Sequence, residues 1–527
     1  MNYKAAMKTP DKKKWEKAVE EEHERMVKMD VWEATKVTDI PKDVKLITST
    51  WAMKKKSNGT FRARVNARGF MQVPGEHFNS DSISSPVMNE ATIRVVMVLS
   101  VVFGWANQLV DVKGAFLCGN FQEEKPIYMK VPEGFESYYA EGMVLRLMKT
   151  IYGLKQAARA FWRELTAALS DMRYSQSPAD PCLYYCWTMK GLIIWLSWID
   201  DCLIAGNHDG VELAKEQMKQ RFDCDDVGEL KEYVGCKIER SEKAIRFTQP
   251  VLLQSFEDEF QCKEGKVTIP AEAGSVLEKC AENEALTEGE QTRYRSGVGK
   301  LLHMMRWSRP EIYNAVRELS HFMTIGASSV HMKAMERVMS YCLTTRNRGL
   351  LIEPAQEWDG NPEFEVVILG RSDSDYAKDP ETRKSISGTS TFLCGAPIIQ
   401  RSTMQKIVAL SVTEAELIAA TSNAQDMMYV KRLLESMSLR VKLPMILEVD
   451  NKGAVDLINN YSVGGRTRHM ETRQYYLREL KEKNIMVVKW KAGAENSSDM
   501  FTKNLPKKEF SKHAAVYVGL DEYMGQL

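Results

Sequence analysis

The sequence lacks long apolar runs, closely paired cysteines and any marked excess of charge. Its most apolar stretch, from Gly191 to Ile199, is too short to cross a bilayer and ends at two aspartates, so we expect no membrane partner. The ten cysteines include no Cys-x-x-Cys pair, and no histidine cluster accompanies them, which argues against a disulfide framework and a zinc site. The first twenty residues are charged and do not resemble a signal peptide.

A formal charge of only +1 would by itself argue against a nucleic-acid partner, but the charge is segregated. Residues 51–70 carry six basic side chains and no acidic one, and a basic patch binds phosphate locally whatever the total charge. The same stretch predicts a β-hairpin, because Asn58-Gly59 stands between two strand-like segments. A solvated hairpin with lysines that protect its edge is the alternative.

Two adjacent aspartates, Asp200 and Asp201, stand between two apolar runs in the segment LIIWLSWIDDCLIAG. Runs rich in Ile, Leu and Trp predict strands, so we expect the aspartates at the tip of a hairpin. Adjacent carboxylates repel each other, and a divalent cation is the simplest group that neutralises them. Asp111 follows another short apolar stretch, and on a neighbouring strand it would complete a site for two metal ions. The alternative is an ordinary solvated turn.

Length and composition indicate more than one domain. Two polar, Pro- and Gly-containing joints, at 263–292 and 344–363, separate a helical segment at 294–343 from a C-terminal unit. Periodicity predicts further helices at 12–29, 92–102, 153–165, 211–222, 250–260 and 413–437.

Four carboxylates of the C-terminal unit stand where predicted elements begin or end. We expect Asp373 and Asp450 each after a strand, Glu416 in the first turns of a helix, and Asp499 near the start of another element. Ser411-x-x-Glu414 fits a capping box and leaves Glu416 free to point into a site. Four converging carboxylates would hold two divalent ions for phosphodiester hydrolysis. Four unrelated surface acids are the alternative.

His469 stands in the basic segment GRTRHMETR, beside Arg466, Arg468 and Arg473. A phosphate contact or a helix start explains such a histidine better than a general base does.

Together these segments resemble the C-terminal part of the Pol polyprotein of copia-type LTR retrotransposons, a reverse transcriptase followed by RNase H. The similarity runs from about Trp15 to about Gly519. Twelve segments carry it: RARVNARGFMQ, FNSDSISSPV, QLVDVKGAFL, IYMKVPEGFE, IYGLKQAARAFW, WIDDCLIAG, SRPEI, SDSDYAKDPETRKSISG, ALSVTEAELIA, VDNKGAV, RTRH and SSDMFTKNLP.

The resemblance implies roles for individual residues. Asp111, Asp200 and Asp201 take the place of the polymerase metal carboxylates. Phe116 matches the steric gate under the sugar of the incoming nucleotide. In the second unit the implied RNase H metal ligands are Asp373 (with Asp375 as a competitor for this position), Glu416, Asp450 and Asp499. Triphosphate contacts are implied for Lys54 and Arg64, a nucleotide and template contact for Gln156, and nucleic-acid contacts for Lys155, Arg159, Arg468 and His469.

The implied fold class is α+β: a right-hand polymerase with fingers, palm and thumb, then a helical connection and an RNase H-like α/β domain. We expect an N-terminal helix at 1–30, the reverse transcriptase at 31–262, the linker and helical connection at 263–363, the RNase H-like domain at 364–510 and a C-terminal tail at 511–527.

The implied function is RNA-directed DNA synthesis with RNase H activity, with Mg²⁺ (or Mn²⁺) as cofactor, two ions per active site. The implied partners are an RNA or DNA template-primer, dNTPs and an RNA/DNA hybrid, in cytoplasmic virus-like particles or in the nucleus. We expect a partial Pol, because no protease, zinc-knuckle or integrase motif is present. The alternatives are a non-catalytic, nucleic-acid-binding remnant of the same Pol and a nuclease whose polymerase half is only a binding arm.

Three residues depart from the family pattern. Trp198 replaces a usual Tyr before the aspartate pair, Gly114 a frequent Thr and Ala158 a frequent Pro. None of the three is an expected metal ligand.

Overall fold

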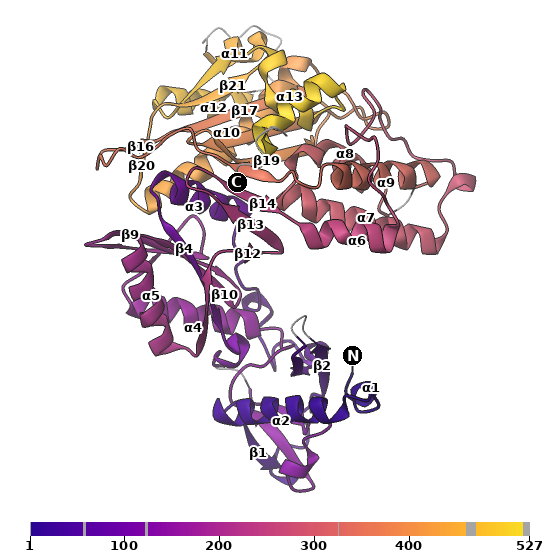
Figure 1. The fold of residues 1–527 in the computed structure, drawn as a ribbon, viewed down its shortest axis with the longest axis vertical. Coiled ribbons are helices and arrows are strands. Elements are labelled where there is room, and N and C mark those ends of the chain that lie inside the picture. The colour runs from indigo at the N-terminus through magenta and orange to yellow at the C-terminus, as the bar shows by residue number, and fades with distance from the viewer. Residues whose placement is uncertain (1, 56–58, 122–124, 325, 460–470, 520–527) are drawn as a thin grey trace. The chain divides into compact units, whose positions relative to one another are not determined.

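The computed structural model describes residues 2–55, 59–121, 125–324, 326–459 and 471–519. It contains two compact units, whose elements are labelled in Figure 1. Unit 1 comprises Met1–Met88, Gln108–Ser177 and Pro181–Gly228, and unit 2 comprises Asn89–Asn107, Pro178–Asp180 and Glu229–Leu527. The chain therefore passes from unit 1 into unit 2 three times and returns to unit 1 twice.

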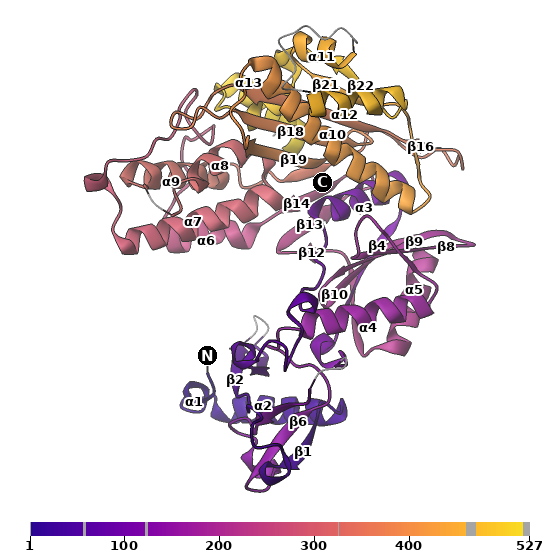
Figure 2. The same ribbon diagram turned by 180° about the vertical axis from the view of Figure 1, so that it is seen from behind.

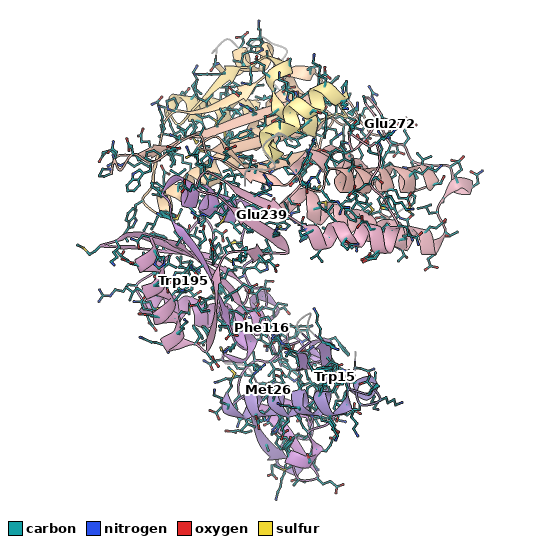
Figure 3. All side chains as sticks on the ribbon, in the orientation of Figure 1. Trp15, Met26, Phe116, Trp195, Glu239 and Glu272 are labelled. Carbon is teal, nitrogen blue, oxygen red and sulfur yellow. The ribbon has the colours of Figure 1, made fainter. Side chains whose placement is uncertain are left out.

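The N-terminal part of unit 1 packs a helix on a β-hairpin. After the short α1 (Tyr3–Ala6), helix α2 (Lys12–Lys28) buries one apolar stripe, which includes Trp15 and Met26, both labelled in Figure 3. That stripe packs against the hairpin of β2 (Ser49–Lys55) and β3 (Phe61–Ala67). The expected helix at 12–29 and the expected hairpin are confirmed. A second small sheet has the order β1 (Trp32–Lys36), β6 (Met143–Leu147), β5 (Ile127–Lys130).

The central sheet of unit 1 has six strands in the order β11-β4-β10-β9-β8-β7. Strands β9 (Gly191–Trp198) and β10 (Asp201–Gly206) pair antiparallel, with Trp198 opposite Asp201, which confirms the expected hairpin. Trp195 of β9, labelled in Figure 3, is buried in this sheet. The remaining elements are β4 (Ala106–Val112), β7 (Ser175–Gln176), β8 (Leu183–Thr188), β11 (Cys224–Glu229), α4 (Ala157–Asp171) and α5 (His208–Arg221).

Helix α4 begins at Ala157, four residues later than expected. Gly153 has φ +88°, and a Cβ there would lie 2.2 Å from the carbonyl oxygen of Ala67. A backbone at positive φ cannot continue a right-handed helix, so residues 153–156 form a turn that packs against β3.

Unit 2 contains a small sheet and a group of helices that share one core. Its small sheet has the order β12 (Glu232–Tyr233), β13 (Cys236–Arg240), β14 (Ile245–Thr248), β15 (Leu350–Ile352), so part of the expected linker is a paired strand. The helices that follow share one buried core: α6 (Pro250–Phe260), α7 (Glu288–Trp307), α8 (Tyr313–Ser320) and α9 (Ser329–Thr344).

Helix α3 (Glu90–Val102) belongs to unit 2, although its sequence lies within the expected reverse transcriptase range. Figures 1 and 2 both show it beside elements of that unit. Arg94 is fully buried and donates to the carbonyl oxygen of Ile398 at 3.0 Å and to Oε1 of Gln400 at 3.1 Å. These contacts join residues some 300 positions apart, which local periodicity does not reveal.

The C-terminal part of unit 2 is a five-stranded sheet covered by helix α10 (Val412–Ser436), which crosses it in Figure 2. Strands β17 (Ile368–Asp375), β18 (Ile386–Leu393) and β19 (Ala396–Met404) are antiparallel neighbours. Strands β21 (Met445–Val449) and β22 (Met486–Trp490) run parallel to β17, which gives the order β19-β18-β17-β21-β22. The remaining elements are β16 (Glu365–Val366), β20 (Arg440–Val441), α11 (Lys452–Asn459), α12 (Glu471–Glu482) and α13 (Lys507–Val518).

Residues 511–518 are not a tail, because they form the second half of α13. Tyr517 is fully buried in the unit 2 core, and its hydroxyl lies 2.8 Å from that of Ser497. The charged first half of the helix concealed the apolar residues Ala514, Tyr517 and Val518, which anchor it. Among the described residues, no helix is long and apolar enough to span a membrane.

Candidate active sites

The first candidate site lies where β4 and β10 run side by side in unit 1. Asp111 is the penultimate residue of β4, Asp201 begins β10 and Asp200 precedes it. A backbone hydrogen bond of 3.1 Å from Val112 to Asp200 joins the two segments. The three carboxylates predicted from the motifs therefore come from adjacent strands of one sheet.

Mutual repulsion is visible at Asp201. Although the residue keeps exposed surface, partial loss of solvation and the neighbouring charges of Asp200 and Asp111 raise its pKa to about 6. The nearby cation Lys113 is engaged elsewhere, by Asp225 at 2.7 Å and Asp223 at 3.4 Å. Carboxylate oxygens suit a hard divalent cation such as Mg²⁺, but among the described residues this group does not bring three ligand oxygens within 4.8 Å of one another.

A pocket of about 230 Å³ joins these carboxylates to basic side chains. Asp111 and Asp200 line it together with Arg25, Arg62 and Arg64. Cross-strand register places Lys54 opposite Arg62 on the hairpin, but Lys54 is not among the lining residues. The pocket therefore brings carboxylates and guanidiniums together, and Arg64 is the predicted triphosphate residue that lines it.

An aromatic side chain that the sequence did not single out connects two predicted residues. Tyr152 is buried, and its ring centroid lies 4.5 Å from the Arg64 guanidinium carbon and 5.4 Å from the ring centroid of Phe116. Phe116, labelled in Figure 3, is half-buried in the short 3₁₀ helix at 115–117. Gly114 before it has φ +64°, which a β-branched Thr adopts only with strain, and this accounts for one departure from the family pattern.

Gln156 is held by its own neighbours. Its Nε2 donates to the carbonyl oxygen of His77 at 3.0 Å, and its Oε1 accepts from Gln72 at 2.9 Å. The predicted contact with nucleotide and template stays a prediction, and the structure adds a role in shaping this loop. Lys155 is exposed and lies 4.5 Å above the Phe78 ring. Arg159 donates to the carbonyl oxygen of Ser84 at 2.7 Å.

The second candidate site gathers three carboxylates in unit 2. Asp373, Glu416 and Asp450 each offer an oxygen, and these oxygens all lie within 4.8 Å of one another. Asp450 directly follows β21, as expected, and Glu416 lies in the first turns of α10. Asp373 lies inside β17 and not after it, because the strand extends to Asp375 and pairs with β18 throughout.

The carboxylates of the second site are buried, and neighbouring groups balance their negative charge only in part. Burial and the nearby carboxylates raise the pKa of both Asp373 and Glu416 well above the usual range, although Lys503 opposes the effect at Asp373. Glu416 Oε1 accepts from the Ser374 amide at 3.0 Å and from its hydroxyl at 2.8 Å. Among the described residues, Glu416 Oε2 has no hydrogen-bond partner, although it is buried. An orphaned carboxylate oxygen in this position fits a metal ligand.

The other predicted residues of this unit lie around the three carboxylates. Asp499 is close enough to raise the pKa of Asp373, but it pairs with Lys503 at 2.5 Å. Asp375 pairs with Lys378 at 3.1 Å and is not part of the cluster, so Asp373 is the better first ligand. Arg468 and His469 lie outside the described residues. His513 of α13 is buried near Asp499, and the expectation of a tail concealed it.

The Ser411 hydroxyl accepts from the Glu414 amide at 3.1 Å, but the Glu414 carboxylate accepts from Leu410 at 2.7 Å. The Ser411 side of the expected capping box is therefore present, whereas the Glu414 carboxylate bonds the amide one position before the expected one. Glu416 remains available to the cluster.

Comparison with known proteins identifies the family of the segment that holds the first site. Residues 30–273 match the family described as "Reverse transcriptase (RNA-dependent DNA polymerase)". This segment holds every predicted residue of the unit 1 site.

Curated relatives extend the similarity to nearly the whole chain. The Pol polyprotein from transposon TNT 1-94 of Nicotiana tabacum is 31% identical over 96% of this chain and 38% of its own length. The Pol polyprotein from transposon RE1 of Arabidopsis thaliana is 28% identical over 95% of this chain and 33% of its own length. The chain belongs to the copia-type retrotransposon Pol family, as its motifs predicted. It spans about a third of the length of these relatives.

Two solved structures of the foamy viral protease-reverse transcriptase also align with the chain. The complex with double-stranded DNA has a TM-score of 0.45 at 11% identity and covers 91% of this chain and 70% of its own. The complex with RNA/DNA hybrid has a TM-score of 0.45 at 12% identity and covers 93% and 55%.

Proposed function

We propose that this chain is an RNA-directed DNA polymerase that extends a primer with dNTPs, and that unit 2 cleaves RNA in an RNA/DNA hybrid. The observation that carries the polymerase is the pocket shared by Asp111, Asp200, Arg62 and Arg64 within the reverse transcriptase segment. Template-primer, dNTPs and hybrid are the proposed partners. Cytoplasmic virus-like particles, or the nucleus, are the proposed location.

In the first site, Asp111, Asp200 and Asp201 would hold two Mg²⁺ (or Mn²⁺) ions. Bound ions of this kind supply Lewis acidity to the attacking and leaving oxygens of a phosphoryl transfer. Arg62 and Arg64 bind and orient the phosphates, and a planar guanidinium fits them in a bidentate manner. Phe116 lies beside Tyr152, where it excludes a 2′ hydroxyl from the space under the sugar.

In the second site, Asp373, Glu416 and Asp450 would hold the ions, with Asp499 at the rim. Ser374 fixes Oε1 of Glu416, while the buried Oε2 has no hydrogen-bond partner among the described residues. The proposal for RNA hydrolysis depends on this buried cluster.

Incorporation of dNTPs on a primed homopolymer with magnesium or manganese tests the polymerase. Asp200→Asn should reduce synthesis by at least about 100-fold, since metal ions stabilise transition-state charge by several kcal/mol. The exposed Asp171→Asn at the end of α4 is the matched control and should behave as wild type. Wild-type rates in Asp200→Asn would refute the assignment.

Cleavage of the RNA strand in a labelled hybrid tests the second activity and separates the alternatives. Hybrid cleavage without synthesis would make unit 1 a binding arm. Hybrid binding with neither activity in the folded wild-type chain would identify the non-catalytic remnant.

A further inference from the structure

One side of the unit 1 pocket comes from helix α2, which precedes the residues matched by the reverse transcriptase family. Ala18, Glu21, Glu22 and Arg25 of this helix line the same pocket as Asp111. The helix is therefore part of the pocket wall as well as of the hydrophobic core.

Glu22 is the unusual member of this group, because its side chain is only 1% exposed. Burial raises its pKa, while Arg25, the Val65 amide and Arg64 act in the opposite direction. A buried carboxylate is costly unless its oxygens are bonded, and both oxygens of Glu22 are.

The two oxygens reach different parts of the pocket. Oε1 accepts from the backbone amide of Val65 at 3.2 Å, in the middle of β3 and next to Arg64. Oε2 accepts from Arg25 at 3.2 Å. The Glu22 carboxylate thus fixes both strand β3, which carries Arg64, and the Arg25 side chain of its own helix.

The Arg64 side chain is held by a ring contact and by the position of its own strand. Its guanidinium lies over the face of Tyr152, and among the described residues its buried Nε has no hydrogen-bond partner. A stacked guanidinium keeps its edge open for a phosphate, but its position depends on the backbone of β3.

We propose that Glu22 is a positioning residue for nucleotide binding, which holds Arg25 and the β3 backbone so that Arg64 faces the phosphates of the incoming nucleotide. The proposal rests on the proposed polymerase function for the identity of the ligand. It assigns to the N-terminal helix a part in substrate affinity that acts through Arg64 and not through contact with substrate.

The sign of the effect distinguishes this role from simple electrostatics. Removal of a negative charge beside a phosphate-binding pocket should by itself tighten triphosphate binding. Glu22→Gln should instead weaken it by about 5- to 30-fold, because Arg25 loses its ionic partner and the Val65 amide loses a charged acceptor, which loosens the strand that carries Arg64. Glu22→Asp keeps the charge but shortens the reach, and it should weaken binding in the same direction.

The measurement is the equilibrium dissociation constant for dATP, with magnesium, on a primer-template whose primer ends in a dideoxynucleotide. Glu20→Gln, an exposed change on the same helix, is the matched control and should bind dATP as the wild type does. Melting temperatures of all variants, with Glu22→Asp as the variant that keeps the charge, separate lost positioning from lost folding.

A double-mutant cycle identifies the route of the effect. In an Arg64→Gln background, Glu22→Gln should change dATP affinity by less than about 2-fold, because the group through which it acts is gone. Full additivity, unchanged affinity in Glu22→Gln, or tighter binding would overturn the proposal. Loss of primer extension with intact and Glu22-dependent dATP binding would refute the polymerase function alone.

Discussion

At the scale of residues, the unit 1 site depends on like charges held close together. Asp201 carries a raised pKa beside Asp200 and Asp111, while Lys113 is occupied by Asp223 and Asp225. Cations for the aspartates must therefore come from solution, whereas the guanidiniums of Arg62 and Arg64 remain for phosphate. This division of charge is what the proposed binding of a polyanion by a nearly neutral chain requires.

Phe116 allows a prediction about sugar choice. Phe116→Val should lower the ratio of dNTP to rNTP incorporation by about 10- to 100-fold, because it removes a clash with the 2′ hydroxyl. Phe121→Val, a partly buried ring of the same core, is the matched control and should leave the ratio unchanged. An unchanged ratio in Phe116→Val with a large fall in melting temperature would make Phe116 a core residue, with a cavity cost of about 1–4 kcal/mol.

At the scale of elements, the unit 2 site depends on three segments that meet. Strand β17, the start of α10 and the end of β21 each bring one carboxylate, and burial raises the pKa of Asp373, Glu416 and Asp450. The folded, metal-free chain therefore holds more protons at this site than the unfolded chain does.

The sign of this linkage predicts a pH dependence of stability. Because the folded pKa values lie above the unfolded ones, the contribution to stability is fully present below about pH 4 and is lost as the pH rises through the neutral range. Added Mg²⁺ should restore the melting temperature at pH 8 and have little effect at pH 5. Glu416→Gln should abolish much of that magnesium-dependent rise. It should also raise the metal-free melting temperature at pH 8, where wild-type Glu416 must bind a proton on folding, and barely alter it below about pH 4. An equal magnesium effect in Glu416→Gln would contradict the metal site.

Sequence alone predicts the elements well, because each has a local signal. The Asp200–Asp201 hairpin, the β2–β3 hairpin and helices α2, α3 and α6 follow from runs, turns and periodicity. Sequence alone does not reveal contacts between segments that lie far apart in the chain. The contact of Glu22 with Val65, the position of Tyr152 between Arg64 and Phe116, and the attachment of α3 to unit 2 join segments that no local pattern connects. The tail prediction failed because α13 is anchored by tertiary burial.

At the scale of the whole molecule, the two sites lie in different units, so their activities should be separable. Asp450→Asn should stop RNA cleavage in a hybrid and leave primer extension within about 2-fold of wild type. Paired assays on one preparation provide the measurement, and Asp456→Asn of α11 is the control. Loss of both activities from a chain that stays folded would contradict the division of labour.

Binding of template-primer should depend steeply on salt despite the net charge of +1, because counterion release follows local phosphate contacts. Arg62→Gln should reduce the slope of log K against log salt by about 1. The test is a titration of affinity between low and moderate salt, with Lys243→Gln, an exposed change in unit 2, as control. A flat response would exclude nucleic acid as the partner.

Helix α3 has a consequence for how this protein can be divided or recombined. Strand β4, which carries Asp111 of unit 1, begins only four residues after α3 ends. Arg94 of α3 is nevertheless buried against β19 of unit 2, the unit to which α3 itself belongs. A fragment that ends at residue 273 would contain the buried Arg94 guanidinium without Ile398 and Gln400, whose oxygens accept its hydrogen bonds. The segment matched by the reverse transcriptase family and the rest of the chain are therefore not interchangeable cassettes. A chimera that joins residues 1–273 of this chain to the remainder of a relative would place α3 against a strand that does not match it. The contact is kept only if α3 is exchanged together with the rest of unit 2.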